Sequence, residues 1–253
     1  MRNEAAIFLL SLQFLTRIPV PIANLYTPER MNASARYYPL VGFIVGALCA
    51  GIFWILTFIF PLILALALSI ASGLLITGAF HEDGLADTFD GIGGGHDRDQ
   101  ALAIMKDSRL GTYGTLALGM ALFIKFSSLT MLPTAWIVAA LVLGHGLSRL
   151  SSTLVIATSS YARGDGKAKP VADGLSPTSL AITVITGLAG IIVGALVLPL
   201  YALCLACAGA AAAHIGMRLL FERKLDGYTG DTLGAVQQVS EIGFYLGLVA
   251  WAS

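Results

Sequence analysis

The sequence predicts an all-α protein whose helices cross a membrane several times. Only 12% of the 253 residues are charged, 57% are hydrophobic, and the mean hydropathy is +0.81, whereas soluble domains carry about 25% charged residues. Residues 37–80 and 174–213 contain no Asp, Glu, Lys or Arg. Each of these runs is long enough for two spans of about 20 residues. Backbone groups in lipid must be satisfied within the protein, so we expect helices here.

Three prolines divide the long apolar runs. Pro61 separates 41–60 from 62–80, Pro133 separates 115–132 from 134–156, and Pro199 separates 180–198 from 200–221. Proline ends a helix and restricts the residue before it. We therefore expect three transmembrane hairpins with turns at these prolines, within a single integral-membrane catalytic domain spanning residues 1–253.

Two further apolar segments lie outside the hairpins. Residues 5–15 are too short for a span and suit an interfacial or re-entrant helix. Residues 233–251 form a last apolar helix. The sequence leaves open whether either segment crosses the bilayer, and whether copies of the chain form a homo-oligomer.

The charged residues are predicted to lie on one side of the membrane. If each run spans once, the loops 1–36, 81–110, 157–176 and 222–231 share a side, and they carry twelve of the fifteen Lys and Arg residues. The proline turns carry none. An excess of Lys and Arg marks cytoplasmic loops, so we expect this active face to be cytoplasmic. The formal net charge of zero gives no reason to expect a nucleic acid as a partner. We expect membrane lipid to surround the helices.

The motif HEDGLADTFDGIGGG, residues 81–95, places four acids within nine residues. If the second helix of the first hairpin continues through it, Asp83, Asp87 and Asp90 share one face and repel one another. A divalent cation would relieve that repulsion, and carboxylates with substrate phosphate suit Mg²⁺. The candidate metal ligands are Glu82, Asp83, Asp87 and Asp90. A solvated helix end with Asp-Gly turns is the alternative.

Basic residues supply candidate phosphate contacts. Lys106 and Arg109, in KDSRLGTYG (106–114), suit phosphate oxygens, although Arg109 also fits a topological anchor. Arg149 lies within an apolar run, where a cation favours an anionic site over lipid. The segment 161–169, which contains Arg163, is either a topology signal or the mouth for a large anionic substrate.

Three other ionisable residues have two interpretations each. His81 is either a general base beside the acids or a hydrogen-bonded interfacial histidine. Asp231, at the entry of the last helix, is either an N-cap or a further metal-side carboxylate. Glu241 lies inside that helix and faces either a packed partner or a polar cavity.

These residues together favour metal-assisted phosphoryl transfer at a membrane surface. Such catalysis rests mainly on positioning and on charge neutralisation by metal and cations. A secondary transporter would keep its ionisable groups near the midplane, whereas nearly all acids here lie at the ends of the apolar runs. The residues alone do not identify the substrate.

Four motifs, in order, resemble the cobalamin synthase family of adenosylcobinamide-GDP ribazoletransferases. They are QFLTRIPVP (13–21), HEDGLADTFDGIGGG (81–95), MKDSRLGTYG (105–114) and GYTGDTLGA (227–235), and they cover nearly the whole chain. The CDP-alcohol phosphatidyltransferases, with the motif Asp-Gly-x-x-Ala-Arg, are the alternative enzyme family. Here the sequence DGLAD departs from that pattern.

The resemblance implies a magnesium-dependent enzyme of the cell inner membrane. It implies transfer of the corrinoid phosphate from adenosylcobinamide-GDP to α-ribazole or α-ribazole 5′-phosphate, releasing GMP and forming adenosylcobalamin or its 5′-phosphate. Asp83 or His81 would accept the hydroxyl proton. Lys106, Arg109 and Arg149 would steady the leaving charge, beside the metal candidates Glu82, Asp83, Asp87, Asp90 and Asp231. A carrier for a cation or a corrinoid is the alternative from a different class.

Overall fold

The computed structural model describes residues 2–21, 24–163 and 174–252. The regular secondary structure in this part of the chain is helical apart from one isolated bridge between Tyr161 and Tyr228. The all-α prediction is confirmed. The helices are α1 (Arg2–Leu15), α2 (Pro28–Ser34), α3 (Tyr38–Leu56), α4 (Leu62–Thr77), α5 (Phe80–Gly94), α6 (Arg98–Ile104), α7 (Thr112–Thr130), α8 (Thr134–Thr158), α9 (Pro177–Gly194), α10 (Leu200–Leu225) and α11 (Gly230–Ala252).

The three turns lie where the prolines predict them. Pro61, Pro133 and Pro199 each directly precede the first residue of a helix, α4, α8 and α10 respectively. A proline is tolerated at a helix start because the N–H it lacks would have no acceptor there. The multi-span prediction holds as well. Among the described residues, five helices are long and apolar enough to cross a membrane, or six if the bent pair α4 and α5 counts as one span.

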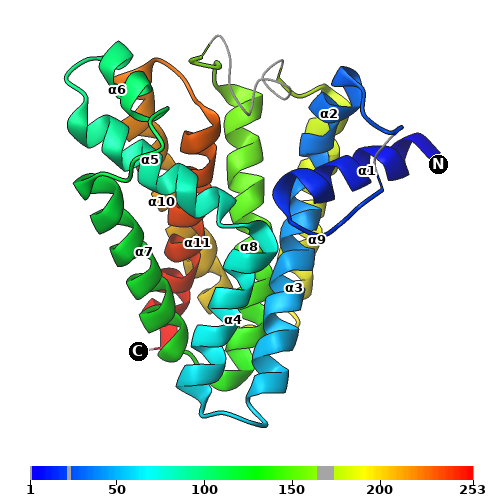
Figure 1. Ribbon diagram of the computed structural model, residues 1–253. Coiled ribbons are helices and arrows are strands. Elements are labelled where there is room, and N and C mark those ends of the chain that lie inside the picture. The colour runs from blue at the N-terminus through cyan, green and yellow to red at the C-terminus, as the bar shows by residue number, and fades with distance from the viewer. Residues whose placement is uncertain (1, 22–23, 164–173, 253) are drawn as a thin grey trace.

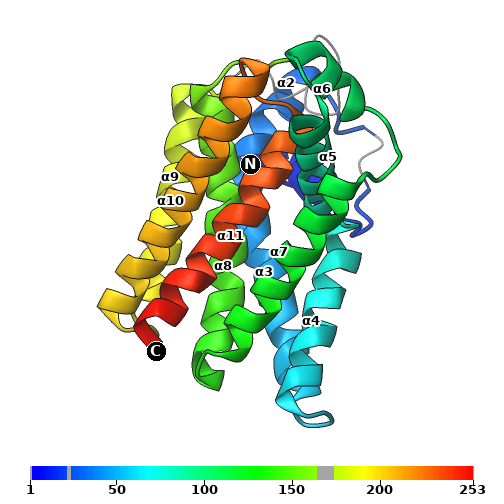
Figure 2. The same cartoon turned by 90° about the vertical axis from the view of Figure 1, so that its left-hand side faces the viewer.

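Of the three hairpins, only the first has two helices, α3 and α4, that pack against each other along their length. The helices α7 and α8 diverge from their turn, as do α9 and α10, and α11 lies against α7, α8 and α10 (Figures 1 and 2). Helix α11 contacts α5, α7, α8 and α10, and α8 packs against α3 and α9. The last helix is therefore the centre of the bundle, with most of its side chains buried.

The first hairpin ends in a sharp break. Gly78 and Ala79 both take left-handed conformations, with φ of 66° and 54°, and the Ala79 N–H donates to Leu74 O at 2.8 Å. Glycine suits this helix end because it has no Cβ to clash. Helix α5 leaves at 86° to α4. The expectation that one helix continues through the acidic motif was therefore wrong.

The charged connections gather at one end of the bundle, here called the charged end. Helices α1, α2, α5 and α6 lie there, and the proline turns lie at the opposite end (Figure 1). Helix α1 is apolar but shorter than a span, and it lies across the bundle near α2 and α3 (Figure 1). The break after α4 thus places the acidic helix α5 among the other charged segments.

Candidate active site

Helix α5 presents its four acids on different sides. Asp83 is exposed and Asp87 is half-buried, and these two residues form what we call the acidic face. Glu82 and Asp90 are buried, at 7% and 6% exposure. Burial thus divides a motif in which the sequence alone treats all four carboxylates as equivalent.

Close packing against α11 fixes the acidic face. A Cβ atom at Gly84 would lie 2.7 Å from the carbonyl oxygen of Asp231, so a larger residue would push the two helices apart. Gly84 lies between Asp83 and Asp87 on the same helix. The approach therefore brings Asp231, from a distant motif, beside the acidic face.

Asp90 holds the start of α7. Its two carboxylate oxygens accept hydrogen bonds from the backbone N–H groups of Gly111 at 2.7 Å and Gly114 at 2.8 Å. These N–H groups belong to the first turn of α7, where helices have no internal acceptors, and a negative charge there is favourable. Both oxygens of this predicted metal ligand are therefore engaged in joining α5 to α7.

Glu82 points into the bundle instead of toward the acidic face. Its Oε1 atom accepts a hydrogen bond from Gln238 Nε2 at 2.7 Å. Its Oε2 atom is buried with no hydrogen-bond partner in the described chain. Glu82 thus belongs with the polar groups of the interior.

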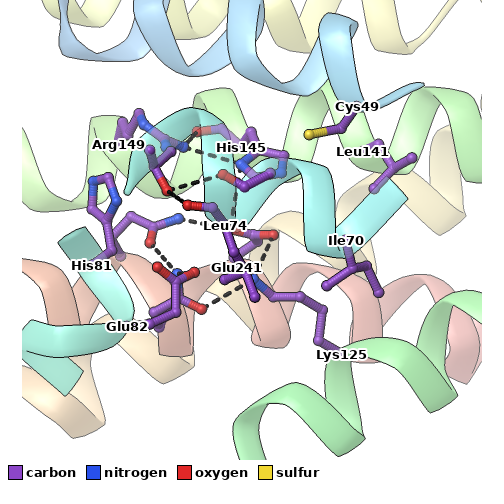
Figure 3. A pocket seen from close by; sticks show the side chains of 14 residues that line it. Cys49, Ile70, Leu74, His81, Glu82, Lys125, Leu141, His145, Arg149 and Glu241 are labelled. Carbon is purple, nitrogen blue, oxygen red and sulfur yellow. Dashed lines mark hydrogen bonds and ion pairs between the residues drawn. The ribbon is translucent and has the colours of Figure 1, made fainter. Parts of the chain in front are cut away.

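A buried polar network lies beneath α5 (Figure 3). At its centre Glu241, fully buried, pairs with Lys125 at 3.1 Å between Oε1 and Nζ, and accepts a hydrogen bond from the Tyr245 hydroxyl at 2.9 Å. Lys125 also donates to Gln238 Oε1 at 3.0 Å, which links the ion pair to Glu82. Glu241 therefore has packed partners and also lines a polar cavity, so both interpretations of this residue hold.

His81 and Arg149 also lie in this interior. They line a cavity of about 20 Å³ together with Glu82 and Glu241, and their exposed fractions are 5% and 2%. Arg149 Nη1 donates to the carbonyl oxygen of His145 at 2.9 Å. A cavity of this size holds a water molecule but no phosphate group. Neither residue shares the acidic face with Asp83 and Asp87.

The Asp231 carboxylate, at the start of α11, contacts a residue outside its own helix. Thr229 Oγ1 accepts from the N–H of Thr232 at 3.2 Å, so Thr229 caps the helix. Asp231 Oδ2 lies 2.8 Å from Nη1 of Arg163. The N-cap interpretation of Asp231 therefore gives way to that of a carboxylate beside α5.

Lys106 and Arg109 lie on the exposed connection between α6 and α7. The Arg109 Nε and Nη2 atoms donate to the Asp107 carboxylate, and this guanidinium lowers the pKa of the Asp107 carboxyl. The donors by which Arg109 would hold a phosphate are therefore occupied by a neighbouring side chain.

The donor set at the acidic face suits a magnesium ion completed by substrate. Within residues 2–21, 24–163 and 174–252, no three His, Cys, Asp or Glu side chains are grouped closely enough to hold a metal by themselves. Mg²⁺ commonly takes only one or two carboxylates, and substrate phosphate supplies further oxygens. Carboxylates of this kind belong to Asp83 and Asp87 on the acidic face and to Asp231, which also pairs with Arg163. Glu82 binds Gln238, and Asp90 binds the start of α7.

Comparison with known proteins places the chain among enzymes of cobalamin synthesis. The family model described as cobalamin-5-phosphate synthase matches residues 7–249. The chain is 41% identical to the adenosylcobinamide-GDP ribazoletransferase of Shewanella amazonensis, covering 98% of this chain and 96% of that protein. It is 44% identical to that of Leptothrix cholodnii, with coverage of 98% and 96%, and 41% identical to that of Vibrio cholerae, with 99% and 96%. No solved structure matches the chain.

Proposed function

The chain belongs to the cobalamin-5-phosphate synthase family, and we propose that the acidic face of α5 is where its reaction takes place. Like the relatives named above, it is an adenosylcobinamide-GDP ribazoletransferase. The reaction moves the corrinoid phosphate from adenosylcobinamide-GDP to α-ribazole or its 5′-phosphate. One observation carries the proposal: at the charged end, outside the buried network, the backbone of Asp231 packs on Gly84 of the helix that carries Asp83 and Asp87.

In the proposed step, a hydroxyl oxygen of the ribazole bonds to the phosphorus attached to the corrinoid. The bond from that phosphorus to the oxygen it shares with GMP breaks, and GMP leaves with the electron pair. The hydroxyl proton passes to the Asp83 carboxylate. Asp83 suits this role better than His81, because the Asp83 side chain is exposed whereas the His81 side chain is buried in the bundle.

Asp87 and Asp231 would hold a magnesium ion at this face. When bound, the ion neutralises the charge of the diphosphate and of the departing GMP. Carboxylates are suitable ligands, because Mg²⁺ prefers hard oxygen donors and readily shares its sites with phosphate. The magnesium requirement is thus proposed from the chemistry of the donors.

The proposed setting is the inner membrane, with the charged end in the cytoplasm and the whole chain acting as one catalytic domain. The distribution of Lys and Arg supports this orientation, since the proline turns carry neither. A face in the cytoplasm gives water-soluble nucleotides direct access to Asp83 and Asp87.

The direct test uses the purified full-length protein in detergent, supplied with adenosylcobinamide-GDP and α-ribazole. We expect GMP and the coupled corrinoid in equal amounts, and only when both substrates and Mg²⁺ are present. α-Ribazole 5′-phosphate is tested in parallel to establish which acceptor is used. If no GMP is released under these conditions, the proposal is wrong, and this is also the result expected of a carrier.

A further inference from the structure

Arg163 occupies a fixed position at the charged end, just after α8. The backbone before it is tied to the segment that precedes α11: Tyr228 N donates to Ser160 O, and Ala162 N donates to Tyr228 O, both at 2.8 Å. Arg98 Nη2 also donates to Ala162 O at 2.7 Å. These bonds join three segments that are distant in sequence, so the position of Arg163 is set by the fold.

The guanidinium of Arg163 uses only one of its edges. Its Nη1 atom pairs with Asp231, while Nε and Nη2 are buried and have no hydrogen-bond partner in the described chain. The side chain is 9% exposed. The N–H groups of Nε and Nη2 point in parallel, which is the edge by which arginine grips two oxygens of one carboxylate or phosphate. Buried donors without acceptors are unfavourable, so a group with two acceptor oxygens would be stabilised at this edge.

Arg163 is connected to helix α5 through Asp231. Arg163 holds Asp231, and the backbone of Asp231 packs on Gly84 between Asp83 and Asp87. A cation and several carboxylates at one place suit a diphosphate that carries its own metal ion. On the basis of the proposed function, we propose that Arg163 binds the diphosphate of adenosylcobinamide-GDP through Nε and Nη2.

Two other arginines are less suited to this role. The same edge of Arg109 is filled by Asp107, and its side chain is 86% exposed. Arg149 lines the internal cavity of about 20 Å³, which excludes a phosphate group. Arg163 combines a buried guanidinium, an unused two-donor edge and a connection to helix α5 through Asp231.

The test compares Arg163→Lys with the matched control Arg223→Lys, an exposed arginine in the last turn of α10 that lies outside the proposed site. Lysine keeps the charge and loses the paired donors. We expect the KM for adenosylcobinamide-GDP to rise roughly 10- to 100-fold in Arg163→Lys, the loss expected for a hydrogen bond to a charged group. Competitive inhibition by inorganic pyrophosphate should weaken by the same factor, with the KM for α-ribazole unchanged. Arg223→Lys should leave all three constants within about twofold.

A purely structural role would alter stability or both KM values together, which separates it from diphosphate binding. If Arg163→Lys does not fold, Arg163→Gln serves in the same assays. The inference is overturned if the substituted protein is as sensitive to pyrophosphate as the wild type, or if the control shows the same loss. Absence of GMP release by the wild type would instead refute the proposed function, so the two failures are distinguishable.

Discussion

The acidic face of α5 and the buried polar network beneath it contain the same kinds of residue in opposite circumstances. In the network, Glu241 is fully buried and is paired with Lys125, and Glu82 is bonded to Gln238. At the acidic face, Asp83 is exposed and Asp87 is half-buried. One helix contributes to both regions, because consecutive residues of α5 point to different sides.

This comparison indicates that burial determines the role of a carboxylate in this protein. A charge removed from water must be paired and hydrogen-bonded, because desolvation is otherwise too costly. The network therefore consists of partners that hold helices together. An acid near the surface carries no such cost, and it can bind and release a metal ion or a phosphate compound during each turnover.

The largest expected effect concerns the network. Lys125→Met leaves Glu241 buried without its cation, and breaking one partner of a buried pair costs about 3–5 kcal/mol. We expect that loss in the free energy of unfolding, measured by reversible denaturation in detergent. The double substitution Lys125→Met with Glu241→Gln should recover part of it, because no uncompensated charge remains. A single variant as stable as the wild type would contradict a structural role for the pair.

Substitutions at the acidic face should affect catalysis and leave stability unchanged. We expect Asp87→Asn to reduce the rate of GMP release by roughly 100-fold or more, because even residues that only support metal ligands typically contribute 10–100-fold. Asp83→Asn should have a loss of similar size, since an amide cannot accept the proton. The free energy of unfolding should stay within about 0.5 kcal/mol of the wild type. Near-native rates in both variants would remove the proposed site.

The contact between α5 and the start of α11 can be tested at Gly84. In Gly84→Ala the new Cβ would meet the Asp231 carbonyl oxygen at 2.7 Å, and overpacking of this kind costs about 1–3 kcal/mol. Gly119→Ala is the matched control in a helix, because a Cβ there meets nothing within 4 Å. We expect Gly84→Ala to lose both stability and GMP release, whereas the control loses neither. Equal behaviour of the two variants would mean that the close approach of α5 and α11 is unimportant.

The smallest expected effect is the loss of stability in a variant of Asp90. If its function is to cap α7, Asp90→Asn should lower the free energy of unfolding by about 1 kcal/mol, since helix caps contribute about 0.5–2 kcal/mol. Its rate of GMP release should fall much less than that of Asp87→Asn. Side-by-side assays of these two variants decide the point. An equally large rate loss in Asp90→Asn would support the metal role that the sequence predicts for this residue.

The sequence predicted the spans and the ends of the bundle well, because both depend on local signals. Pro61, Pro133 and Pro199 mark helix starts through their own covalent geometry, wherever the chain lies in space. The charged loops likewise gather at one end because each span reverses the direction of the chain (Figure 1).

The sequence did not predict features that depend on tertiary packing. The break at Gly78 carries no proline, and a glycine in an apolar run is compatible with a continuous helix. The inward orientation of the Glu82 side chain depends on its hydrogen bond with Gln238. In the sequence, Gln238 is distinguished from its neighbours only as an amide within an apolar helix. The ion pair between Arg163 and Asp231 depends on the backbone hydrogen bonds between two distant segments.

The most direct test of the account is a magnesium titration of GMP release, for the wild type and for Asp87→Asn. We predict that the wild type releases no GMP in EDTA and that its rate of GMP release rises to saturation with increasing Mg²⁺. For Asp87→Asn we predict a half-saturating concentration roughly 10-fold or more higher, the loss that follows from removing one charged oxygen contact. Full turnover without divalent ions, or an unchanged half-saturating concentration in Asp87→Asn, would contradict the account.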